Sequence, residues 1–207
     1  MHHAIDERAR AGTARWYVIQ CKGGESFRAA EHLVNQAYEV FHPVLEVQRK
    51  RRGRLTWVEE PLAGSDLCGL AELRRASGVR IAGGEMTRTF AEGLAALDAD
   101  AFDVYQQDVV LTGMLRARTL AELALARNRW FTPHTWTNGI GVLANLHVAA
   151  GVGAGPFIEF PYDPPGWTPE RRDFMLATPV RPGSDGILRI PQAPGLGIVL
   201  DEAAVTR

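Results

Sequence analysis

VRIAGGEMTRTFAEGLAALDADAFDVYQQD, residues 79–108, joins two apolar strand patterns through one helix pattern. The apolar residues of TRTFAEGLAALDAD (87–100) recur at helical spacing, and Thr89 and Glu92 have the spacing of a capping box. The flanking strand patterns are nearly continuously apolar, as in strands of a parallel sheet that are buried on both faces. The stretch therefore predicts one β/α unit that leads into the next strand.

The same unit repeats along the chain after about residue 55. Helix patterns at 65–77, 114–130 and 140–151 alternate with apolar strand patterns. The polar residues at or near the ends of these strands are 26, 23, 26 and 25 residues apart, and they are Glu59, Glu85, Asp108, His134 and Glu159. This repeat predicts an α/β fold with parallel strands, arranged as part of a (β/α) barrel.

Side chains at the carboxyl ends of parallel strands converge on one rim, where barrels of this type keep their active sites. Carboxylates from neighbouring strands, Glu59 and Glu85, suit a hard cation such as Mg²⁺. Asp108 would hold the ring of His134 in one tautomer, which makes His134 a candidate general base. Glu159 in its acid form would hydrogen-bond a substrate oxygen.

Three of these residues also have a simpler interpretation. Glu59 and Glu60 would face solvent at the end of a strand. Asp108 would cap the following turn, and His134 would be a hydrogen-bonded core histidine. His147, in the middle of a helix pattern, is expected to be structural.

Residues 1–54 differ in character from the rest of the chain. They hold ten Lys and Arg against six Asp and Glu, whereas residues 55–207 hold thirteen against eighteen and no lysine. RWYVIQC and HPVLEVQ read as strands on either side of a helix at 25–41, and RKRRGR (49–54) as an exposed hairpin tip. A basic tip is usually a solvated turn, but Arg51 and Arg52 would also contact phosphates.

The composition and the N-terminal sequence bear on where the protein is located in the cell. No apolar run reaches the roughly 18 residues of a membrane span, and the N-terminus lacks the apolar segment of a secretory signal. Cys21 and Cys68 are far apart and have no ligand-like spacing, so both are expected to be reduced. We therefore expect a cytoplasmic protein with no membrane partner.

The segment from Trp16 to Leu62 resembles the start of the NusG N-terminal domain, particularly of RfaH-type antiterminators. The resemblance rests on Trp16-Tyr17, Cys21-Lys22, Arg28-Ala29, Glu31-His32-Leu33 and the closing EPL. It implies a short α+β segment, residues 1–55, that binds RNA polymerase and single-stranded DNA. Lys22, Arg28 and His32 would then contact nucleic acid together with the basic tip.

Residues 56–207 carry a longer resemblance, in WVEEPLAGSDLCGL, AGGE, QQDVV, PHTWTNGIG, IEFPYDPP and PGLGIVLDE. These strings resemble the C-terminal barrel portion of the mandelate racemase and muconate lactonizing enzyme family of the enolase superfamily, and most closely its acid-sugar dehydratases and related racemases. The resemblance implies strands four to eight of a TIM-type barrel, with Glu59 and Glu85 as Mg²⁺ ligands and Asp108–His134 as the dyad that moves a proton α to a carboxylate. Glu159 would hydrogen-bond the resulting enediolate of a hydroxy or sugar acid.

The two resemblances meet at Glu59-Glu60-Pro61-Leu62, so the chain reads as a chimera. The family's strand-two lysine bases and strand-three metal ligand have no counterpart here, which predicts weaker Mg²⁺ binding and impaired catalysis. The expected function is therefore that of an enolase-superfamily lyase or racemase, and the alternative is a NusG-like elongation or antitermination module. The sequence leaves homo-oligomer formation open.

Overall fold

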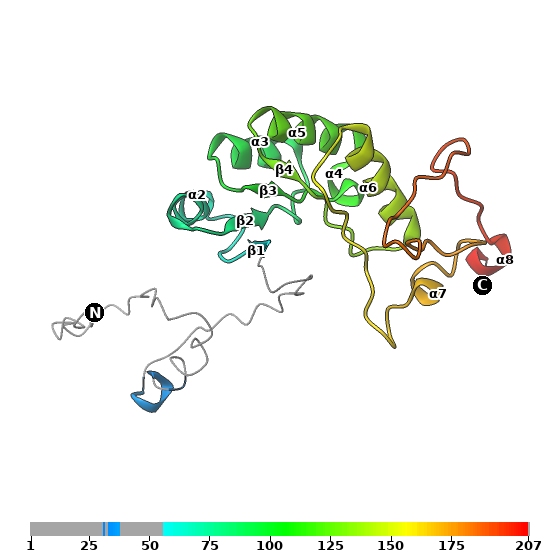
Figure 1. Cartoon of the computed structure of the whole chain (residues 1–207), viewed down its shortest axis with the longest axis horizontal. Helices are drawn as coiled ribbons and strands as arrows, with labels where there is room; N and C mark the ends of the chain where they lie inside the picture. The colour runs from blue at the N-terminus through cyan, green and yellow to red at the C-terminus, as the bar shows by residue number, and fades with distance from the viewer. Residues whose placement is uncertain (1–30, 32, 38–55, 207) are drawn as a thin grey trace. The chain divides into compact units, whose positions relative to one another are not determined.

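The computed structural model describes residues 31, 33–37 and 56–206 (Figure 1). The chain divides into two compact units, Met1–Val44 and Leu45–Arg207. In the first unit the described residues are helical at 31 and 33–35 and form a turn at 36–37, where Ala37 has a φ of 62°. The helix predicted to run through Phe41 is therefore interrupted, because a left-handed residue cannot continue a right-handed helix.

The second unit is built on a parallel sheet of four strands in the order β1-β2-β3-β4. The strands are β1 (Trp57–Glu59), β2 (Arg80–Gly83), β3 (Val104–Tyr105) and β4 (Trp130–Phe131). Their register pairs Val58 with Ile81, Ala82 with Val104, and Tyr105 with Phe131. All four strands lie where the sequence predicts them, and all point the same way.

Helices connect these strands or follow the last of them. They are α2 (Leu67–Ala76), α3 (Phe90–Asp98), α4 (Val109–Thr112), α5 (Met114–Ala126), α6 (Gly139–Gly151), α7 (Pro169–Arg172) and α8 (Glu202–Val205). Helix α5 packs against α3, α6 and β4 (Figure 1). The predicted capping box is present: Thr89 accepts from the N–H of Glu92, whose carboxylate accepts from the N–H of Thr89.

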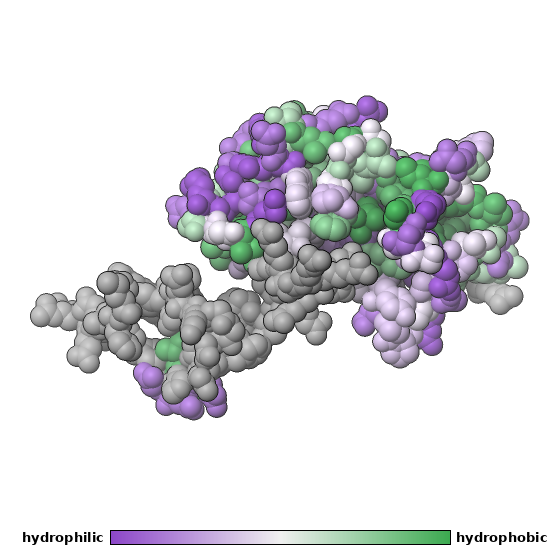
Figure 2. Space-filling model, in the orientation of Figure 1, coloured by the Kyte–Doolittle hydropathy of each residue, from purple (hydrophilic) through white to green (hydrophobic). Residues whose placement is uncertain are grey.

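The buried core lies between the sheet and helices α2 to α6. It contains Leu70, Ile81, Leu97, Phe102, Tyr105, Leu120 and Phe131. In the view of Figure 2, hydrophilic residues cover the region of α2 and α3, and hydrophobic surface lies toward α6 and the C-terminal segment. Among the described residues no helix is long and apolar enough to cross a membrane.

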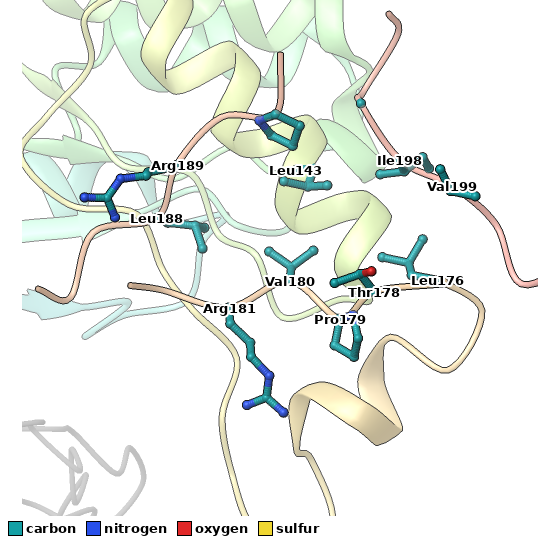
Figure 3. A pocket seen from close by; sticks show the side chains of 12 residues that line it. Leu143, Leu176, Thr178, Pro179, Val180, Arg181, Leu188, Arg189, Ile198 and Val199 are labelled. Carbon is teal, nitrogen blue, oxygen red and sulfur yellow. The ribbon is translucent and has the colours of Figure 1, made fainter. Parts of the chain in front are cut away.

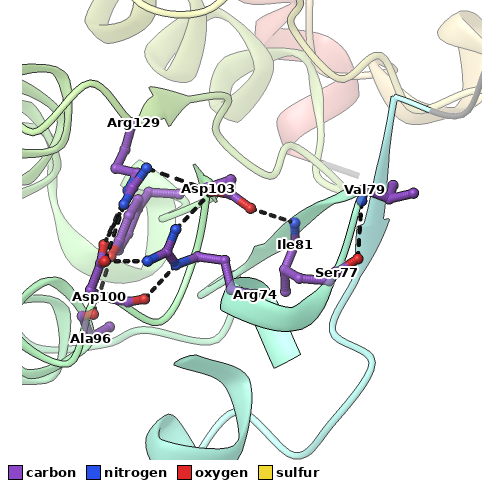
Figure 4. Close-up of polar contacts among 9 residues, drawn as sticks. Arg74, Ser77, Val79, Ile81, Ala96, Asp100, Asp103 and Arg129 are labelled. Atoms are coloured by element: carbon purple, nitrogen blue, oxygen red, sulfur yellow. Dashed lines mark hydrogen bonds and ion pairs between the residues drawn. The ribbon is translucent and has the colours of Figure 1, made fainter. Parts of the chain in front are cut away.

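The amino-terminal edge of the sheet is closed by an ion-pair network (Figure 4). Arg74 on α2 contacts the carboxylates of Asp100 and Asp103, and Arg129 contacts both of them from the segment before β4. Asp103 also accepts from the N–H of Ile81 at 3.0 Å. The network ties α2, β2, β3 and β4 together and leaves the opposite, carboxyl edge free for a site.

The fifth strand predicted at PFIEF (156–160) does not form. The N–H of Gly155 reaches the carbonyl of Phe131 at 3.1 Å, but the next residue, Pro156, has no N–H with which to extend a ladder. Glu159 is held by Thr135 instead of by a neighbouring strand. Among the described residues the parallel sheet therefore has four strands, and the segment at 156–160, predicted to form the fifth, is irregular.

Candidate active site at the strand ends

All five predicted site residues lie at the carboxyl edge of the sheet or are held against it. Glu59 is the last residue of β1, and Glu85 follows β2. Asp108 is the N-cap of α4, just after β3, and His134 follows β4. Glu159 joins them from the segment after α6, because its carboxylate accepts from the N–H of Thr135 at 2.6 Å.

Asp108 and His134 form the predicted pair. Nδ1 of His134 lies 3.2 Å from Oδ2 of Asp108, and the side chains are 19% and 5% exposed. Hydrogen bonding to Asp108 raises the pKa of His134, and burial opposes this effect. Burial acts to raise the pKa of Asp108, but hydrogen bonds from His134, Asn145 and the N–H of Val110 outweigh it and lower the pKa below its usual value. The pair is therefore arranged to stabilise an ionised Asp108 beside a basic imidazole.

Glu85 faces the other side of the same ring. Its Oε2 lies 3.8 Å from Nε2 of His134. Burial raises the pKa of Glu85, the imidazole of His134 opposes this, and the nearby carboxylates of Glu60 and Glu59 raise the pKa further. The imidazole thus lies between two carboxyl groups, with Nδ1 toward Asp108 and Nε2 toward Glu85.

Glu159 is anchored by the residue that follows His134. Besides the bond from the N–H of Thr135 to its carboxylate, the hydroxyl of Thr135 donates to its backbone carbonyl. Burial raises the pKa of Glu159, the Thr135 N–H opposes this, and the charges of Glu59 and Asp108 add to the rise. A carboxyl group in this environment retains its proton to a higher pH than usual, and in that form it donates a hydrogen bond.

The two adjacent carboxylates after β1 have different partners. Oε2 of Glu59 accepts from the indole N–H of Trp57 at 3.1 Å. Glu60 has a φ of 39°, and its Oε1 accepts from the N–H of Gly84 at 3.2 Å. Glu60 is therefore partly buried, and its side chain bonds back to the loop after β2.

The predicted Mg²⁺ ligands, Glu59 and Glu85, both lie at this rim and offer the oxygen atoms that Mg²⁺ prefers. Within residues 31, 33–37 and 56–206, however, no three His, Cys, Asp or Glu side chains come together as a group that could hold a metal ion. The described carboxylates therefore supply only part of a donor set.

Sequence reasoning missed Thr135 and Asn145. Asn145 is fully buried in α6, and its Nδ2 donates to Oδ1 of Asp108 at 2.8 Å. The available signal was a single amide among the apolar residues of IGVLANLHVAAG. His147, interpreted as structural, has its Nε2 at 3.4 Å from the carbonyl of Leu196.

The predicted nucleic-acid contacts Lys22, Arg28, His32, Arg51 and Arg52 lie outside the described residues. Their role stays a prediction.

A separate hollow of about 260 Å³ lies between α6 and the C-terminal segment (Figure 3). Its lining includes Leu143, Leu176 and Val180 and none of the predicted site residues. Arg181 and Arg189 at its edge are paired with Glu170 and Asp185. Because both cations already have carboxylate partners, the chemistry is better placed at the strand ends.

Comparison with known proteins identifies the family of the chain. Residues 34–204 match a family model described as enolase C-terminal domain-like. A D-galactarolactone cycloisomerase from Agrobacterium fabrum is 28% identical over 177 residues, which are 83% of this chain and 47% of that protein. An arabinonate dehydratase from Saccharolobus solfataricus is 30% identical over 168 residues, which are 80% of this chain and 43% of that protein.

The chain is also similar in fold and sequence to solved structures. A crystal structure of a predicted mandelate racemase from Rhodobacter sphaeroides has a TM-score of 0.66 and 31% identity, and the match covers 74% of this chain and 39% of that one. The chain thus spans less than half the length of these relatives. The family match begins at residue 34, upstream of the predicted boundary at 56, and the NusG-like interpretation of residues 1–55 gains no support from these comparisons.

Proposed function

The chain belongs to the enolase C-terminal domain-like family, and on that premise we propose that it supplies the proton-transfer side of an active site for hydroxy or sugar acids. The reaction would remove or return a proton on the carbon next to the substrate carboxylate. The names of two relatives, a D-galactarolactone cycloisomerase and an arabinonate dehydratase, support this substrate class.

The observation that carries the proposal is the orientation of His134. With Nδ1 bonded to Asp108 at 3.2 Å, the ring directs Nε2 toward the space shared with Glu85. A neutral imidazole that keeps its proton on Nδ1 has a lone pair on Nε2 and accepts the α-proton there. The ionised Asp108 then stabilises the imidazolium that forms.

Glu159 would act on the other product of the proton transfer. As the proton leaves, negative charge moves onto the substrate carboxylate and creates an enediolate. A protonated Glu159 donates a hydrogen bond to that charge, and its raised pKa supports this form. Its anchor on Thr135, the residue after His134, holds donor and base in a fixed relation.

Mg²⁺ with Glu59 and Glu85 among its ligands stays part of the proposal, as a Lewis acid for the substrate carboxylate. Since the described residues give only part of a donor set, no step above depends on the ion.

Exchange of the α-proton for deuterium tests the proposal. The chain is incubated in D₂O with Mg²⁺ and a panel of aldonic and aldaric acids, and exchange is followed by NMR. We expect exchange with the wild type, none with His134→Asn, and full retention with the control His147→Asn, which changes a histidine of α6 that bonds only weakly to Leu196. Absence of wild-type exchange, or equal exchange in His134→Asn, contradicts the proposal.

A further inference from the structure

We propose that Asn145 is a positioning residue that orients the carboxylate of Asp108 and thereby keeps the proton of neutral His134 on Nδ1. The proposal rests on the proposed function only in taking His134 as the base. The arrangement itself concerns three side chains from three parts of the chain: α6, the end of β3 and the end of β4.

Three hydrogen bonds fix the orientation of the side-chain amide of Asn145. Its Nδ2 donates to Oδ1 of Asp108 at 2.8 Å and to the carbonyl of Gly141 at 3.2 Å. Its Oδ1 accepts from the N–H of Val109 at 3.1 Å. Both hydrogens and the oxygen of a fully buried amide are therefore used, and the amide cannot flip without losing these bonds.

The two carboxylate oxygens of Asp108 have different hydrogen-bond partners. Oδ1 receives the N–H of Val110 at 2.8 Å as well as the Asn145 amide. Oδ2 is left for His134, 3.2 Å away. Two donors on one oxygen fix the plane of the carboxylate and direct the other oxygen at Nδ1.

A carboxylate held in this way decides the tautomer of the imidazole. The bond made by one ring nitrogen determines which nitrogen carries the proton. An ionised Asp108 accepts only, so Nδ1 must be the donor and Nε2 must hold the lone pair. If Asp108 turned, the neutral ring would be free to carry its proton on Nε2, and that tautomer has no lone pair on Nε2 with which to accept the α-proton.

The neighbours of Asn145 show that packing alone does not explain it. Val142, Leu143, Ala144 and Leu146 around it in α6 are buried and apolar. An amide in such surroundings costs stability unless all its groups are bonded, and Asn is a poorer helix former than Leu. Leu would serve the helix better, so what Asn145 supplies is its hydrogen bonds to Asp108 and to the N–H of Val109.

The experiment reads the tautomer directly. In the full chain with ¹⁵N-labelled histidine, the shifts of Nδ1 and Nε2 of neutral His134 give the fraction of each tautomer. The variant is Asn145→Leu, which removes the donor to Asp108. The control is Asn138→Ala on the same helix, which removes an N-cap that accepts from Ile140 and Gly141 and has no bond to Asp108.

In the wild type we expect the Nδ1–H tautomer to dominate. Asn145→Leu should raise the Nε2–H fraction severalfold. Asn138→Ala should lower the melting temperature and leave the tautomer ratio unchanged. Circular dichroism confirms folding, and Asn145→Ala, which adds no atoms, replaces the Leu variant if that one does not fold.

Two results overturn the inference. One is a folded Asn145 variant whose melting temperature falls while His134 keeps its Nδ1–H tautomer, since Asn145 would then only tie α6 to α4. The other is a wild-type His134 that carries its proton on Nε2, which needs no variant. Because neither measurement uses a substrate, failure of this inference is distinguishable from failure of α-proton exchange.

Discussion

The guanidinium of Arg172 is fully buried and bonds to four acceptor atoms in the C-terminal segment. It donates to both carboxylate oxygens of Asp173 at 2.6 and 2.7 Å, and to the carbonyls of Pro161 and Val180, each at 2.9 Å. It also lies 4.4 Å over the ring centre of Phe160. Arg172→Met removes every one of these bonds and keeps much of the apolar volume.

The loss of stability is expected because the substitution leaves Asp173 buried without its cation. Asp173, also fully buried, would keep the N–H of Val180 at 2.8 Å but lose the cation. Removing one partner of a buried ion pair costs about 3–5 kcal/mol. A chain of this size loses about 2–4 °C in melting temperature for each kcal/mol, so the expected fall is about 6–20 °C.

Urea unfolding and thermal melting of the full chain measure this loss. The control is Arg189→Met, which breaks an exposed pair with Asp185 in the same segment and should leave both readouts nearly unchanged. Amide exchange should also quicken at residues 157–162, because Arg172 holds the carbonyl of Pro161, two residues beyond Glu159. A loss below about 1 kcal/mol for Arg172→Met, within the range of surface pairs, would refute the reasoning.

Two further predictions concern pH and packing at the strand ends. Folding raises the pKa of His134, Glu85 and Glu159 above 6.5, 4.5 and 4.5, so the folded chain binds more protons, and the free energy of unfolding should fall as pH rises from about 5 to about 8. His134→Gln should flatten the upper part of this slope in urea titrations, and a wild-type profile that rises over this range would contradict the assignment. Gly83→Ala would place a Cβ 2.4 Å from Cε1 of the buried Phe102 ring, which should cost about 1–3 kcal/mol. In the control Gly78→Ala the added Cβ meets open space, so the free energy of unfolding should stay within about 0.5 kcal/mol of wild type. Equal losses of stability in the two variants would contradict the argument that close packing against Phe102 excludes a Cβ at position 83.

The features that could be predicted from sequence are the local ones. The capping box of Thr89 and Glu92 and the helical spacing of α3 are properties of consecutive residues, so the pattern shows them directly. The regular spacing of Glu59, Glu85, Asp108 and His134 predicted one rim because parallel strands bring their carboxyl ends together. The four-stranded sheet confirms that geometry.

The features that could not be predicted depend on contacts between distant segments. Glu159 was expected at the end of a strand, but strand formation needs a partner ladder, and Pro156 donates no hydrogen bond to one. The bond between Asn145 and Asp108 joins residues 37 positions apart, and hydrophobic periodicity carries no information about such a pair. The return of Glu60 to Gly84 likewise depends on a backbone angle that the sequence does not reveal.

The titration of His134 tests most directly whether these side chains meet at one rim. Histidine NMR of the full chain gives its pKa in the wild type, in Asp108→Asn and in Glu85→Gln. The account predicts a wild-type pKa above the ordinary 6.5 that falls in both variants, because each carboxylate favours the charged ring. A wild-type pKa at or below 6.5 that neither substitution changes would contradict the account.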